Sequence, residues 1–176
     1  MGKEFSLPFE PGFEINSSYA LLVGTVMIIY SRFESTVVDI IGFHKKGYRS
    51  GYYCREILMP RHLLSDLSGI GKSEDREVIE KVFEGFGRAV KLRNAIDHSV
   101  PCYGPDGYDV LHFQQGTVPR SGKFKYLNPY RGKIFDYDFL LEESKQMVED
   151  YRVAARFFDS LRDRSRKGEE FPGEPC

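Results

Sequence analysis

The sequence predicts an all-α protein: a bundle of four to five helices with a β-hairpin or loop insertion before the last helix. Long segments place apolar residues at helical spacing, and stretches containing glycine and proline separate these segments. One stretch of about 35 residues instead has the composition of short strands and turns. We therefore divide the chain into an N-terminal extension (1–14), a helical domain (15–165, with an insertion at 101–135) and a disordered tail (166–176).

The first helix is expected from Asn16 to about Phe43. Asn16 or one of the two serines after it caps the start, and the glycines of HKKGYRSGYYC end the helix. Its first part, Ile15 to Ser31, carries no charge and therefore needs comparison with a membrane span. It is short for a bilayer and contains asparagine, serine and threonine, so we favour a buried core helix and no membrane association.

Two further helices are expected before the insertion. The second covers Pro60 to Ser68 and has a short apolar face of three leucines. The third is capped by Ser73 and ends by Val100, because Pro101 excludes the residue before it from the α region. The apolar stripe of the third helix consists of Val78, Ile79, Val82, Phe83, Phe86 and Val90.

The last helix is expected from about Tyr137 to Arg164, with apolar residues again at helical spacing. The stretch RDRSRKGEEFPGEPC, which begins at Arg162, has almost no apolar residues. Because such a composition buries too little surface to fold, we expect residues 166–176 to be disordered.

The insertion carries a local excess of positive charge. The segments YDVLHFQQ and KFKYL are predicted to be strands joined by GTVPRSG, and no Asp or Glu occurs from Val110 to Phe135. Basic residues interleaved with aromatic rings are typical of single-stranded RNA binding; the alternative is a solvated hairpin whose rings pack on the bundle. The predicted RNA-binding residues are Arg120, Lys123, Lys125, Tyr126, Arg131 and Lys133.

Composition excludes several classes of protein. The 25 basic and 26 acidic residues give a net charge of −1, so the chain as a whole has no signature of nucleic-acid binding. Three widely spaced cysteines argue against a disulfide framework or structural zinc site, and the N-terminus lacks an apolar signal region. No HExxH, Walker, GxGxxG or GxSxG motif occurs. We therefore expect a cytoplasmic protein without a metal ion or another cofactor.

The segment KLRNAIDHSVP places four polar residues at the end of the third helix. At about 100° per residue, Arg93 and Asp97 continue the apolar stripe, and Asn94 and His98 lie on the adjoining edge. Polar groups that face a bundle need partners, since burial without hydrogen bonds costs free energy. A purely structural interpretation stays open, because Arg93 and Asp97 form an i,i+4 pair and His98 interacts favourably with the helix dipole.

Arg93-Asn94-x-x-x-His98 resembles the motif of the HEPN superfamily, Arg-x4–6-His with Asn often following the Arg. The resemblance implies an α-helical bundle with this motif late in its third helix. It also implies a metal-independent endoribonuclease of a defence or toxin–antitoxin type, with Arg93 and His98 catalytic and Asn94 in support. The insertion departs from the minimal bundle of that family.

The implied chemistry uses the 2′-OH of RNA as the nucleophile. Histidine titrates in the range needed for proton transfer, and arginine binds phosphate oxygens bidentately. One histidine is sparse for both acid and base roles, and the family commonly pairs two motifs across a homodimer. RNA, a second copy of the chain and a cognate antitoxin are therefore the expected partners. The alternative is a non-catalytic HEPN-like module for dimerisation or partner binding.

Two acidic residues are expected to support the site. Glu34 falls on the inward face of the first helix, where a carboxylate needs a cationic partner, and Arg93 is one candidate. A different base is the other possibility for Glu34. Asp97 precedes His98 directly, so its charge either tunes or quenches the motif.

Overall fold

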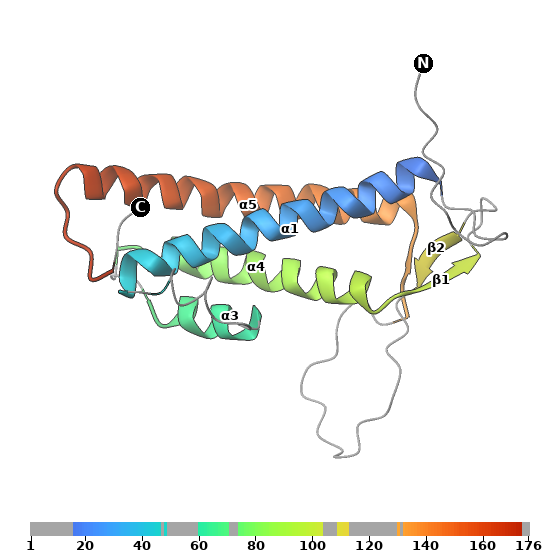
Figure 1. The fold of residues 1–176 in the computed structure, drawn as a ribbon, viewed down its shortest axis with the longest axis horizontal. Coiled ribbons are helices and arrows are strands. Elements are labelled where there is room, and N and C mark those ends of the chain that lie inside the picture. Colours follow the sequence, from blue (N-terminus) through green and yellow to red (C-terminus); the bar gives the residue numbers. More distant parts are fainter. Residues whose placement is uncertain are drawn as a thin grey trace, which may run out of the picture.

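The computed structural model describes residues 16–46, 48, 60–70, 74–103, 109–112, 130 and 132–173. These residues confirm the predicted all-α class and add one small sheet (Figure 1). The helices are α1 (Ser17–His44), α3 (Pro60–Ser68), α4 (Arg76–Asp97) and α5 (Tyr137–Arg166), and the strands are β1 (Val100–Tyr103), β2 (Asp109–His112) and β3 (Ile134–Phe135).

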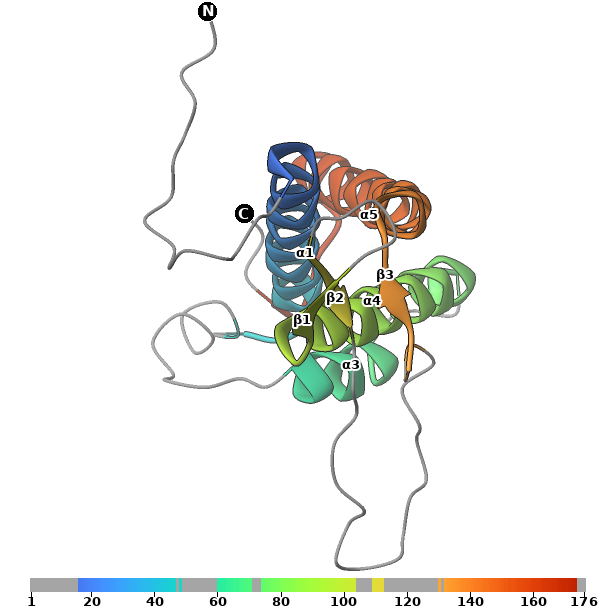
Figure 2. The same cartoon turned by 90° about the vertical axis from the view of Figure 1, so that its right-hand side faces the viewer.

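The three long helices pack around a common core, and α3 lies against α4 (Figure 2). α1 supplies much of this core, including the fully buried Phe33, Ile40 and Phe43. The ring centroids of Phe86 in α4 and Phe33 in α1 lie 5.4 Å apart, so these two rings join α4 to α1. The helical spacing of apolar residues thus places one face of each long helix in a shared interior.

Side-chain caps fix the start of α1 and α5; at α5 the Asp136 side chain accepts a hydrogen bond from the Phe139 N–H at 2.8 Å. The Asn16 side chain accepts hydrogen bonds from the backbone N–H groups of Ser18 (2.9 Å) and Tyr19 (3.4 Å), which confirms Asn16 as the cap of α1. The predicted cap of α4 was placed too early. Ser73 lies outside the described residues, α4 begins at Arg76, and Asp75 occupies its N-cap without a side-chain capping hydrogen bond.

By length and composition alone, α1 could cross a membrane. Its most apolar 18-residue window has a mean hydropathy of 1.4, and 39% of that window is buried inside the bundle. The second half of α1 is the most deeply buried part, with Val37, Val38 and Ile41 at 0% exposure. This half packs as a core helix does.

The sheet lies at the C-terminal end of α4 and has the antiparallel order β1-β2-β3. Val100 pairs with His112, and Leu111 pairs with Phe135. The prediction of a strand within YDVLHFQQ is confirmed, but its described partners are β1 and β3; KFKYL and GTVPRSG lie outside the described residues. Pro101 lies in the edge strand β1, where a missing backbone N–H is tolerated.

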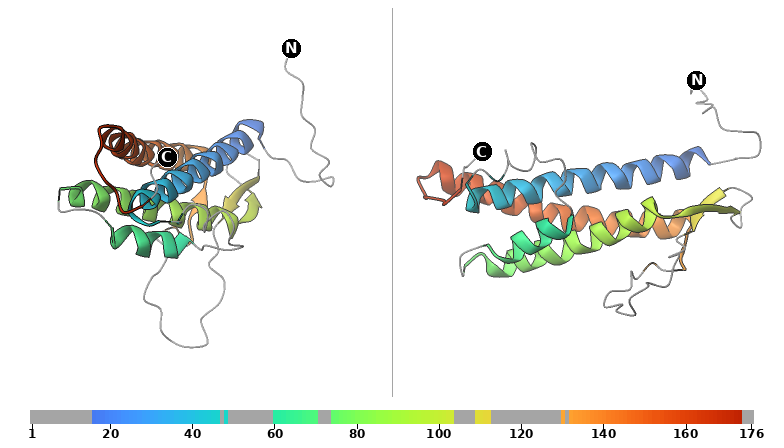
Figure 3. Two further views of the ribbon diagram at one scale, coloured as in Figure 1. Left: turned by 60° about the vertical axis from the view of Figure 1, so that its left-hand side comes forward. Right: turned by 60° about the horizontal axis from the view of Figure 1, so that its bottom comes forward.

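The expectation of disorder in the tail is wrong for residues 166–173, of which Arg166 ends α5. After α5 the chain turns back toward the end of α1 (Figure 3), and the Gly173 N–H donates to the Phe43 carbonyl oxygen at 2.8 Å. Phe171 packs at 5.2 Å from the Phe43 ring, and Glu169 pairs with Arg164. A single aromatic residue and an ion pair thus order a segment whose composition alone indicated disorder. Residues 174–176 are not among those described, nor is the extension 1–14.

Candidate functional site

The motif occupies the last two turns of α4 and its C-cap. Arg93, Asn94 and Asp97 lie inside the helix, and His98 is the C-cap residue. The His98 N–H still donates to the Asn94 carbonyl oxygen (3.1 Å), and the Ser99 hydroxyl donates to the Ala95 carbonyl oxygen (2.6 Å). These bonds satisfy two carbonyl groups of the last turn, where α4 gives way to β1.

Arg93 is half-buried and held from three directions. Its Nη1 donates to the Asn94 Oδ1 (3.0 Å) and lies 2.8 Å from the Asp97 Oδ2. Its guanidinium carbon lies 5.8 Å from the centroid of the Tyr30 ring in α1, within the range of a cation–π contact. The buried Nε has no hydrogen-bond partner among the described residues, so the guanidinium keeps donor capacity.

Glu34 does not pair with Arg93 in the described part of the chain. Its Oε1 accepts a hydrogen bond from the Tyr30 hydroxyl at 3.3 Å, and the ring of the same Tyr30 lies beside the Arg93 guanidinium. The carboxylate that pairs with Arg93 is Asp97, one turn later on the same helix. An i,i+4 pair needs no reach across the contact between two helices, which explains why Asp97 takes this role.

His98 is exposed and lies apart from this cluster. Five residues separate it from Arg93, which places the two side chains roughly 140° apart around the helix axis. Arg93 therefore faces Tyr30 of α1, and His98 faces away from the core. The structure brings Arg93, Asn94 and Asp97 together, and among the described residues no hydrogen bond or ion pair joins His98 or Glu34 to the guanidinium.

Of the predicted RNA-binding residues, only Lys133 is described; Arg120, Lys123, Lys125, Tyr126 and Arg131 are not. Lys133 is exposed just before β3, and its ammonium group lies 5.9 Å from the centroid of the Phe139 ring. It lines a groove between α4 and the start of α5.

This groove has a volume of about 800 Å³ and was missed in the sequence. Arg88 of α4 forms part of its wall and binds Asp150 of α5 bidentately, at 3.0 Å and 2.8 Å. Its lining residues are Arg88, Lys91, Tyr130, Lys133, Phe139, Glu142, Glu143 and Gln146. One signal was available: Asp150 falls three residues after Met147 and four before Ala154, on the buried face of α5. A carboxylate in that stripe needs a cationic partner.

Tyr130 also lines this groove. It is buried, and its hydroxyl donates to the Glu143 Oε2 at 2.7 Å. Burial raises the pKa of the Tyr130 hydroxyl, and the hydrogen bond to Glu143 raises this pKa further. The phenol therefore stays a neutral donor, and one of the acids on this surface is already engaged.

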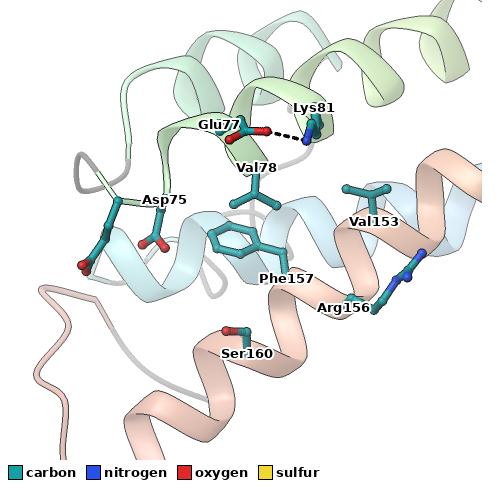
Figure 4. Close-up of a pocket in the computed structure, with 9 residues that line it drawn as sticks. Asp75, Glu77, Val78, Lys81, Val153, Arg156, Phe157 and Ser160 are labelled. Atoms are coloured by element: carbon teal, nitrogen blue, oxygen red, sulfur yellow. Dashed lines mark hydrogen bonds and ion pairs between the residues drawn. The ribbon is translucent and has the colours of Figure 1, made fainter.

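A second groove, of about 560 Å³, lies at the opposite end of α4, against the C-terminal half of α5 (Figure 4). Asp75 lines it and is only 6% exposed. One carboxylate oxygen of Asp75 lies 2.8 Å from Arg164, and the other has no hydrogen-bond partner among the described residues. This groove is separated from Arg93 and His98 by most of the length of α4. In the described ranges, no three His, Cys, Asp or Glu side chains come together as a metal site.

Comparisons of the chain with protein-family models, with curated proteins and with solved structures found no match.

Proposed function

We propose that the protein is an endoribonuclease that cleaves single-stranded RNA without a metal ion, in a defence or toxin–antitoxin setting. The supporting observation is the polar end of α4, where Arg93 is held by Asn94 and Asp97 and His98 is exposed. A guanidinium and an imidazole are the two groups this reaction needs, and the resemblance to the HEPN motif rests on the same residues.

In the proposed reaction, the 2′-OH of one nucleotide attacks the adjacent phosphorus. A base removes the proton of the 2′-OH, the bond to the 5′-oxygen breaks, and an acid returns a proton to that oxygen. One His98 takes both roles in sequence: its imidazole accepts the proton of the 2′-OH, and the imidazolium then returns a proton to the 5′-oxygen. Arg93 binds the phosphate oxygens, whose negative charge grows in the transition state, and Asn94 orients the guanidinium. The products are a 2′,3′-cyclic phosphate and a 5′-hydroxyl.

A composite site explains the separation of the two residues. Because Arg93 and His98 lie roughly 140° apart around α4, a single chain does not direct both toward one phosphate. A two-fold axis near the ends of two α4 helices would set Arg93 of one copy against His98 of the other. We therefore expect a homodimer in the cytoplasm, with an antitoxin as the expected regulator.

The proposal is tested by incubating single-stranded RNA with purified protein in excess EDTA. Wild type should cleave and leave 2′,3′-cyclic ends, and His98→Ala should lower the rate by about 10²- to 10⁴-fold, the usual contribution of general acid–base catalysis. His62→Ala is the matched control, because His62 is exposed on α3 and outside the motif. Strict dependence on added Mg²⁺ or Mn²⁺, or equal losses in both variants, would contradict the mechanism.

A second candidate function is a non-catalytic module for dimerisation or partner binding. It is favoured by Leu21 and Ile28, which are 72% and 60% exposed and lie seven residues apart on one face of α1. Gly24 lies between them, and a Cβ added there would contact nothing within 4 Å. The same cleavage assay separates the two functions, since a module without catalysis leaves RNA intact whether His98 is present or not.

A further inference from the structure

We propose that the groove between α4 and the start of α5 binds the backbone of single-stranded RNA and leads it to His98. The inference rests on the proposed function and extends it, because it names the surface that holds the substrate beside the reacting phosphate. Three cationic side chains from two parts of the chain meet there: Arg88 and Lys91 of α4, and Lys133 before β3.

Arg88 is held in place by a buried acid. Its Nε and Nη2 donate to the two oxygens of Asp150, whose side chain is 10% exposed, and the Gln146 amide also donates to Asp150 at 3.0 Å. The hydrogen bonds to Asp150 raise the pKa of Arg88, so its charge is secure. The Nη1 group makes no hydrogen bond within the described part of the chain, and the side chain is 49% exposed. A guanidinium fixed in this way keeps one edge for a phosphate oxygen at little entropic cost.

Lys91 connects the groove with the motif. Asn94 follows it by three residues and His98 by seven, which places Lys91 and His98 within about 20° of each other around the axis of α4. The two positions are separated by roughly 10 Å along that axis, at 1.5 Å per residue. Both residues are exposed. A single-stranded RNA that lies along this exposed face of α4 would therefore pass from Lys91 to His98 over the protein surface.

The third cation, Lys133, lies outside the helices, directly before β3. Lys133 is exposed, and its ammonium group lies over the ring of Phe139, the half-buried aromatic residue of this groove. Cations beside aromatic rings are the combination found where proteins bind single strands without sequence preference.

The acidic residues of the groove already have partners. Glu142 lies 2.6 Å from the ammonium of Lys145, and Glu143 accepts the hydrogen bond from Tyr130. Glu142 thus pairs with a cation outside the groove, and the hydrogen bond from Tyr130 holds one oxygen of Glu143. The second groove has three acids, Glu74, Asp75 and Glu77, against two cations, Lys81 and Arg156, so its charge suits RNA less well than that of the first groove, which has three cations and two acids.

The test measures the affinity for a single-stranded RNA that is 2′-O-methylated throughout, which lacks the nucleophile and cannot be cleaved. In Lys91→Ser/Lys133→Ser, the Kd should rise roughly five- to tenfold, and the slope of log K against log salt should fall by about 1.4, or 0.7 per lost contact. Arg76→Ser/Lys81→Ser is the matched control, since it removes two exposed cations from the far end of α4. This control should keep the wild-type Kd and slope.

Several results would overturn the groove assignment: an unchanged salt slope in the first variant, an equal loss in the control, or no binding by wild type. A mononucleotide that binds wild type as tightly as the oligonucleotide would also overturn it, because that result indicates a nucleotide pocket. Failure of the groove is distinguishable from failure of the nuclease. If wild type cleaves RNA and His98→Ala does not, the nuclease stands whatever the groove variant shows.

Discussion

Arg93 already forms an ion pair with a carboxylate, that of Asp97. The ion pair with Asp97 joins side chains that are 36% and 31% exposed, so it is worth only about 0.3–0.5 kcal/mol. A phosphodiester carries the same single charge as this carboxylate, but it can accept two parallel hydrogen bonds from a guanidinium, whereas Asp97 pairs with Arg93 through Nη1 alone. If Arg93 binds phosphate as we propose, Asp97 should therefore lower that affinity without blocking it.

Replacement of Asp97 tests this competition. Asp97→Asn should raise kcat/KM for RNA several-fold, since Arg93 no longer exchanges an acid for the substrate, and should cost about 0.5 kcal/mol of unfolding free energy. Single-turnover cleavage and urea denaturation measure the two effects. Glu77→Gln is the control, because it removes another i,i+4 pair on α4, with Lys81, away from the motif. Unchanged or slower cleavage by Asp97→Asn would argue against phosphate binding by Arg93.

At the residue scale, the sequence indicated the local contact of Arg93 with Asp97 but not the partner of Glu34, which depends on packing between helices. The Arg93–Asp97 pair follows from spacing along one helix and could be foreseen. The Glu34–Arg93 pair required the side chains of two helices to meet, and in the structure each of them contacts Tyr30 instead. Which side chain fills such a space depends on rotamers across the interface, and a helical pattern does not contain that information.

At the scale of elements, helices were predictable because their signals are local. Pro60–Ser68 was predicted with its observed bounds, and the last helix was predicted to begin at Tyr137, as it does. Strand pairing is a long-range property, and the partners of β2 were not predicted. Pro101 was interpreted only as the end of a helix, although it also lies in an edge strand.

The contact between α4 and α5 depends on the absence of a side chain at Gly85. A Cβ placed there would lie 2.8 Å from the Asp150 Cβ and 3.0 Å from its Cγ, so the helices must separate or Asp150 must move. Gly85→Ala should therefore lower the unfolding free energy by about 2 kcal/mol, despite the better helix propensity of alanine. Urea denaturation measures the change.

Gly87 provides the matched control two residues later in α4. A Cβ there would contact only the Leu64 Cδ2, at 3.9 Å. Gly87→Ala should thus stabilise the protein by about 0.5–1 kcal/mol through helix propensity. Equal effects of the two substitutions would mean that the close approach at Asp150 does not limit the packing of α4 on α5.

At the scale of the whole molecule, the two ends of the bundle differ in character. The motif and the sheet lie at the C-terminal end of α4, close to the groove between α4 and the start of α5. At the other end, Arg164 pairs with Asp75 and Glu169, and Phe171 packs beside it. Hydrogen bonds to Glu169 and Asp75 raise the pKa of Arg164, so this link between α4, α5 and the returning chain stays charged. These ion pairs could not be predicted from the composition of the tail, because charged residues with few apolar neighbours usually indicate disorder.

Assembly is the prediction that belongs to the whole molecule. Within one chain, Arg93 and His98 diverge around α4, so the proposed nuclease site needs the second residue from another copy. Mixing His98→Ala subunits with Arg93→Ala subunits should then restore part of the activity that each variant lacks alone. In the mixed dimer, Arg93 of the first chain meets His98 of the second at one site, and the other site lacks both. Light scattering at the assay concentration should give the mass of a dimer. A fully active monomer, or a mixture that regains nothing, would exclude the composite site, and the monomer result would still leave RNA cleavage by His98 in place.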